Sequence, residues 1–73
     1  MEFKKGDIVK LIDNTDLRAP RYSLAEVTQN TVISDDFVQI RWKDFTSNLL
    51  ENDGGFYKRR FEIVNESKSF LDL

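Results

Sequence analysis

Basic side chains interleaved with aromatic ones are the feature of this sequence that most suggests chemistry. Arg21 directly precedes Tyr22, and Phe56-Tyr57 directly precedes the basic run 58–60. The basic members of this set are Arg18, Arg21, Arg41, Lys43, Lys58, Arg59 and Arg60. Arginine and lysine neutralise phosphates and pair with carboxylates, while aromatic rings stack on bases and other planar groups. Such a set predicts a binding surface for a protein or for nucleic acid.

The acidic residues, by contrast, form no catalytic or metal-binding pattern. Asp35 and Asp36 are adjacent, so on a strand they would point to opposite faces and could not form a paired-carboxylate site. The runs 13–16 and 52–54 contain calcium-binding residue types but lack the spacing and terminal glutamate of an EF-hand loop. Histidine and cysteine do not occur, and Gly54-Gly55 does not lead into a phosphate-binding helix. We therefore expect no enzymatic activity, no cofactor and no metal site.

Length and charge point to one small soluble domain. The chain has 73 residues, 33% of them charged, with a formal net charge of −2. This balance is not the strongly basic one that drives non-specific nucleic-acid binding. No apolar run approaches the roughly 20 residues of a membrane span, and the start lacks the apolar segment of a signal peptide. We expect a cytoplasmic protein with no membrane partner.

Residues 37–43 must position these side chains, because they form the clearest strand pattern. Val38, Ile40 and Trp42 alternate with polar residues and therefore share one face of a strand. Further short strands are predicted at 8–12, 21–28, 55–57 and 61–64, separated by turn-forming residues, with a marginal two-turn helix as an alternative within 43–55. Five short strands predict an all-β fold, a small, partly open five-stranded barrel.

The barrel is predicted to span residues 1–65, and residues 66–73 to form a short C-terminal tail. Its core is predicted to contain apolar residues placed in phase on separate strands. They are Val9, Val27, Val38, Ile40, Phe61 and Ile63. Phe3 is expected to cover one end of this core.

Three short motifs resemble the Src-homology-3-like small barrels, a superfold that includes the Tudor and KOW groups. They are Phe3-Lys4-x-Gly6-Asp7, Tyr22-x-x-Ala25-x-Val27 and Val38-x-Ile40-x-Trp42-x-Asp44-Phe45. The ending Gly54-Gly55-Phe56-Tyr57-x-x-Arg60-Phe61-Glu62-x-Val64 is similar to small bacteriophage-encoded proteins of mostly unassigned function.

The resemblance to Tudor domains implies an aromatic cage for a methylated cation, formed by Tyr22, Trp42 and Phe45. The sequence departs from the Tudor pattern at Asp13, near where a first-strand aromatic is expected, and at residues 46–48, which replace the usual Gly-Asn. The alternative is that Trp42, in phase with Val38 and Ile40, belongs to the core.

We expect a non-enzymatic interaction module, encoded by a phage or another mobile element, that binds a host or self protein. A nucleic-acid-binding barrel similar to KOW domains and a small structural subunit of a larger assembly are the alternatives. The predicted binding surface is the outward face of the strand at 37–43 together with the long first loop. Its residues are Arg18, Arg21, Tyr22, Gln39, Arg41 and Lys43. The sequence leaves the oligomeric state open.

Overall fold

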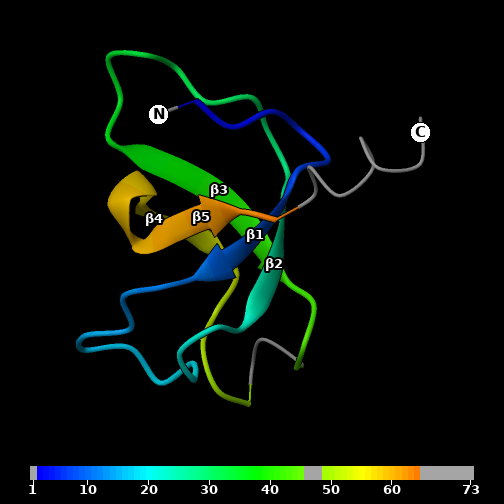
Figure 1. The fold of residues 1–73 in the computed structure, drawn as a ribbon, viewed down its shortest axis with the longest axis vertical. Coiled ribbons are helices and arrows are strands. Elements are labelled where there is room, and N and C mark those ends of the chain that lie inside the picture. The colour runs from blue at the N-terminus through cyan, green and yellow to red at the C-terminus, as the bar shows by residue number, and fades with distance from the viewer. Residues whose placement is uncertain (1, 46–48, 65–73) are drawn as a thin grey trace.

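Five antiparallel strands form one unclosed sheet in the computed structural model, which describes residues 2–45 and 49–64 (Figure 1). The strands are β1 (Ile8–Leu11), β2 (Leu24–Val27), β3 (Phe37–Trp42), β4 (Gly54–Tyr57) and β5 (Phe61–Ile63). A single turn of 3₁₀ helix, η1 (Lys58–Arg60), joins β4 to β5. The predicted all-β class and the five strands are confirmed.

The order of strands across the sheet is β4-β3-β2-β1-β5, so β4 and β5 are its two edges. Only the three residues of η1 separate these edge strands along the chain. The sheet must therefore curve until its edges approach each other, and the Phe56 and Phe61 rings, one from each edge, indeed lie 6.1 Å apart. This curvature gives the partly open arrangement that the sequence predicts.

The inner face of the curved sheet carries the hydrophobic core. Along β3, buried and exposed residues alternate strictly, with Val38, Ile40 and Trp42 inside. Of the predicted core, only Ile63 is partly buried, and it packs against the others, which are all buried. The fully assembled core consists of Phe3, Val9, Leu11, Ala19, Ala25, Val27, Val38, Ile40, Trp42 and Phe61. Phe3 takes the predicted place in the core despite lying outside any strand.

Two predicted segments end up in other conformations. The strand predicted at 21–28 begins only at Leu24, because Tyr22 has a φ of +76° and the Ser23 hydroxyl donates a hydrogen bond to the Pro20 carbonyl. A residue with positive φ cannot continue an extended strand. The described parts of 43–55 contain no helix, and residues 46–48 lie outside the described residues. The predicted tail at 66–73 also lies outside them.

Candidate binding site

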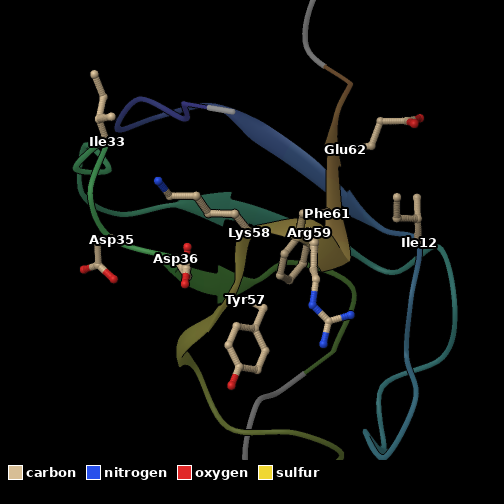
Figure 2. A pocket seen from close by; sticks show the side chains of 9 residues that line it. All are labelled: Ile12, Ile33, Asp35, Asp36, Tyr57, Lys58, Arg59, Phe61 and Glu62. Carbon is tan, nitrogen blue, oxygen red and sulfur yellow. The ribbon is translucent and has the colours of Figure 1, made fainter.

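A surface pocket of about 600 Å³ lies between the loop that precedes β3, the 3₁₀ turn η1 and strand β5 (Figure 2). Ile33, Asp35 and Asp36 come from the loop, and Ile12 and Glu62 lie on the opposite side. Tyr57, Lys58, Arg59 and Phe61 complete the lining. Ile33 is 85% exposed, and Phe61 is a core residue, so the pocket joins an exposed apolar rim to the edge of the core. Such concave, partly apolar sites are where proteins usually bind ligands.

An aromatic–arginine stack borders this pocket. Phe37 and Tyr57 are directly opposite each other on β3 and β4, and their rings stack at a centroid distance of 4.9 Å. The Arg59 guanidinium carbon lies 5.1 Å from the centroid of the Tyr57 ring. Phe37 and Tyr57 are both more than 40% exposed, because they alternate with the inward-facing residues of their strands. Exposed tyrosine and arginine are the residue types enriched in the energetic centres of protein interfaces.

Lys58 holds the loop side of the pocket against η1. Its backbone N–H donates to the Asp36 carbonyl at 2.8 Å, and its ammonium donates to the Val32 carbonyl at 2.9 Å. The ammonium also pairs with Glu2 at 3.5 Å, and the side chain is only 11% exposed. The Thr31 hydroxyl, helped by Lys58, lowers the pKa of Glu2 below its ordinary value. Lys58 therefore acts as an anchor and is not a free cation at the surface.

Asp13 holds Arg59 from the other side. Its carboxylate lies 3.5 Å from Arg59 and 3.8 Å from Arg60, and it accepts hydrogen bonds from the hydroxyl and backbone N–H of Thr15. The Thr15 hydrogen bonds, with the two arginines, lower the pKa of Asp13. Arg60 donates further to the Asp13 and Thr15 carbonyls, which fastens the first loop to η1.

The basic and the acidic residues at the pocket differ in whether they have a partner of opposite charge. Lys58 and Arg59 each have a carboxylate partner. Asp35 and Asp36 have no cationic partner within residues 2–45 and 49–64, and the Asp35 carboxylate accepts only the Phe37 N–H, at 3.1 Å. The part of the pocket rim next to Phe37 is therefore acidic.

The outward face of β3 carries the predicted polar residues, and they are exposed as expected. Gln39 and Arg41 alternate with the buried residues of β3, and Lys43 follows directly after the strand. Arg41, however, lies opposite Glu26 on β2 and forms a 3.0 Å ion pair with it. The positive charge of Arg41 is therefore largely balanced within the sheet.

Tyr22 forms a second aromatic–basic cluster at the start of β2. Its ring is 54% exposed, and the Arg21 guanidinium carbon and the Lys10 ammonium lie 5.0 Å and 5.7 Å from its centroid. Arg21 also donates to the Ile12 carbonyl at 3.2 Å. Arg18, in the same loop, is exposed, but its backbone is held by Glu51 at 3.0 Å, beside the 49–53 segment. The described contacts do not join Arg18 to the Tyr22 cluster.

Of the three rings of the implied cage, Trp42 and Phe45 stack at a centroid distance of 5.1 Å, but among the described residues Tyr22 has no ring contact with either of them. Trp42 is 5% exposed, and its ring contacts are with Phe45, Phe56 and Phe61. Its indole N–H donates to the Asn52 carbonyl at 3.1 Å. In the described part of the chain, no ring contact links Tyr22 to Trp42 or Phe45. Trp42 occupies the core position that its phase with Ile40 predicts.

Sequence reasoning missed the pocket and the stack. The outward phase of Phe37, which alternates with Val38, could have revealed an exposed aromatic ring. Its contact with Tyr57 depends on the β3–β4 register, which the sequence pattern does not specify.

Within residues 2–45 and 49–64, no group of three or more acidic side chains could hold a metal ion, and no helix is long and apolar enough to cross a membrane.

Comparison with known proteins provides no relative for this chain. No protein-family model matches it, and no curated protein and no solved structure shows a significant similarity to it.

Proposed function

We propose that this chain is a non-enzymatic interaction module that binds a partner protein at the pocket beside the Phe37–Tyr57–Arg59 stack. The observation that carries the proposal is the exposure of this stack directly beside a concave, partly apolar surface. Tyr57 and Arg59 provide a large contact area at this place. They lose little conformational freedom on binding, because Phe37 already stacks on Tyr57 and Asp13 already pairs with Arg59.

The rigidity of the pocket supports the same proposal. Lys58 ties the 32–36 loop to η1, and Arg60 ties η1 to the first loop. A surface that is ordered before binding loses less entropy when a partner docks, so a small area can still give useful affinity. The resemblance to small phage-encoded proteins is compatible with a cytoplasmic accessory protein whose partner is a host protein.

The alternative function, nucleic-acid binding, is favoured by a different observation. The Arg21–Tyr22–Lys10 cluster joins a partly exposed ring to two cations, and Lys43 and Arg21 have no carboxylate partner among the described residues. Rings and cations of this kind can stack on bases and neutralise phosphates. Against it, the outward face also carries Glu26 and Glu62, and the pocket rim carries Asp35 and Asp36, all of which repel phosphates.

The variant Ile33→Ser tests the proposal, and Leu49→Ser is its matched control. Both residues are exposed aliphatic side chains, at 85% and 72%, but only Ile33 lines the pocket. If Ile33 is covered by the partner, its loss removes about 1.5–3 kcal/mol of apolar burial, which is roughly a tenfold or greater loss of affinity. Capture would be measured with immobilised protein and lysate of a candidate bacterial host, with and without nuclease.

We expect nuclease-resistant capture of a protein by the parent and by Leu49→Ser, and strongly reduced capture by Ile33→Ser. Equal capture by both variants would show that the pocket is not the binding site. Capture that disappears with nuclease, and that weakens steeply with salt, would instead support nucleic-acid binding through the Tyr22 cluster.

A further inference from the structure

The outer edge of β4 presents backbone groups that have no hydrogen-bond partner among the described residues. Gln39 on β3 lies opposite Gly55, and its carbonyl accepts the N–H of Thr28, on the β2 side. Backbone groups of successive residues in a strand point alternately to its two sides. Because the backbone of Gln39 is directed to β2, the N–H and C=O of Gly55 point away from β3, to the free edge.

The same alternation applies at Tyr57. Its opposite residue, Phe37, donates its N–H to the Asp35 carboxylate, and the next residue along β4, Lys58, donates to the Asp36 carbonyl on the β3 side. The N–H of Tyr57 therefore also faces outward. The described residues provide no hydrogen-bond partner for the N–H or C=O of Gly55 or for the N–H of Tyr57, and both residues are exposed.

Apart from its short length, this edge lacks the features that usually protect a free strand. Natural edge strands are blocked by proline, by charged side chains, by bulges or by being very short. The four residues of β4, Gly-Gly-Phe-Tyr, include no charge and no proline. The opposite edge, β5, has three residues, carries Glu62, and already uses the Phe61 N–H in a hydrogen bond to the Lys58 carbonyl. Of the two edges, as far as the structure describes the chain, β4 is therefore the more open to another strand.

We propose that β4 pairs with β4 of a second copy of this chain, antiparallel and about a two-fold axis beside Gly55, to form a continuous ten-stranded sheet. An antiparallel two-fold pairing brings the same edge of both copies together, so the outward N–H of Gly55 in each copy meets the outward C=O of Gly55 in the other. The absence of a side chain at Gly55 lets the two strands approach at the centre of this pairing.

Charge complementarity favours a second copy over an unrelated strand. Asp53 precedes β4 and has no cationic partner among the described residues, whereas Arg59, whose side chain is 68% exposed beside Asp13, follows the strand. In an antiparallel pair, the acidic end of each copy lies beside the basic end of the other. The inference goes beyond the proposed function, because it concerns a strand edge and not the pocket.

Gly55→Pro, with Gly55→Ala as control, tests this pairing. Both substitutions place a Cβ 2.8 Å from the flexible end of the Gln39 side chain, which can move away, but only proline removes the outward N–H. Sedimentation equilibrium from about 10 µM to 1 mM would give the dimer dissociation constant. We expect the parent and Gly55→Ala to dimerise, and Gly55→Pro to dimerise at least tenfold more weakly.

Amide hydrogen exchange of the parent gives a second measurement that needs no variant. The Gly55 and Tyr57 amides should exchange rapidly in dilute protein and at least tenfold more slowly at the highest concentration, where the dimer forms. A parent that is monomeric throughout, or equal dimerisation of Gly55→Pro and Gly55→Ala, would overturn the proposal. Unchanged exchange of the two amides across the dimerisation range would overturn it as well, and a monomer would leave the pocket free to be tested for a partner protein.

Discussion

Trp42 is the residue at which a core role and a ligand-binding role lead to opposite experimental results. Its ring is 5% exposed, stacks on Phe45 at 5.1 Å, and meets Phe56 and Phe61 at 5.5 Å and 5.9 Å. Removal of a buried aromatic side chain costs about 3–5 kcal/mol. A 73-residue chain has a total stability of about 4–11 kcal/mol at the usual value per residue. Trp42→Ala should therefore remove about a quarter of the stability or more, and at the upper end of the cost it unfolds the domain.

Trp42→Phe provides a graded form of the same experiment. It keeps a ring in the core but removes the indole N–H, so the Asn52 carbonyl loses its 3.1 Å hydrogen bond. The loss of one partly buried hydrogen bond costs about 1–3 kcal/mol. In urea, with a slope near the lower end of about 1–3 kcal/mol/M for so short a chain, the midpoint should fall by about 1–3 M. Circular dichroism is the appropriate probe, since both variants lack tryptophan fluorescence.

Tyr22→Ala is the control, because Tyr22 belongs to the same implied cage but is 54% exposed. Its unfolding free energy should stay within about 1 kcal/mol of the parent. The parent contains one tryptophan, so its emission should shift to longer wavelength only on unfolding, and should not respond to a trimethyl-lysine peptide. Equal midpoints for Trp42→Ala and the parent, or a change of emission on adding the peptide, would refute the core role.

Two further predictions concern the backbone and the ionisable groups of the first loop. Tyr22→Gly should be more stable than Tyr22→Ala by about 1 kcal/mol, because glycine adopts the φ of +76° without steric cost; urea unfolding measures this, and equal stabilities would contradict it. Asp13 has a pKa below its ordinary 3.8 because of the Thr15 hydrogen bonds and the nearby Arg60 and Arg59. A carboxyl group with a lowered folded-state pKa stabilises the fold at pH values above its ordinary pKa. This stability is lost as the pH falls below about 4 and through the folded-state pKa. Asp13→Asn should therefore have a melting temperature that falls less steeply than that of the parent between about pH 5 and 2, and parallel curves would contradict this assignment.

The strands were predictable because inward and outward residues alternate along a strand, and the alternation of apolar and polar residues in the sequence follows this burial. β3 satisfies the pattern at all six positions, and the other four strands contain enough apolar residues in phase to be recognised. Their limits were less predictable, since they depend on the backbone. The start of β2 was placed three residues too early because nothing about a tyrosine predicts a positive φ, which here is imposed by the turn at Pro20 and Ser23.

Core residues outside strands were harder to predict for a different reason. Ala19 is fully buried in the first loop, where no periodic pattern exists to indicate an inner face. Its burial follows from how the loop is held, since the Asn14 side chain donates to the Ala19 carbonyl and Arg60 fastens the start of the loop to η1. Ile63, by contrast, has the correct phase but lies on the short edge strand β5, where only one neighbouring strand covers it. Phase predicts the direction of a side chain, and the position of its strand in the sheet decides how completely it is buried.

The same distinction explains what could be predicted of the candidate site. The exposure of Gln39, Arg41 and Lys43 follows from their phase, which the sequence contains. Their pairing does not, and the Glu26 partner of Arg41 depends on the β2–β3 register. The pocket depends even more on tertiary structure, because the 33–36 loop and η1 meet only once β3 and β4 are paired and Lys58 bonds to Asp36. A charged side chain that looks free in the sequence, such as Arg41, can thus be neutralised in the fold. The surface that we propose for binding lies where the β3–β4 register brings the Phe37–Tyr57 pair beside carboxylates that have no cationic partner among the described residues.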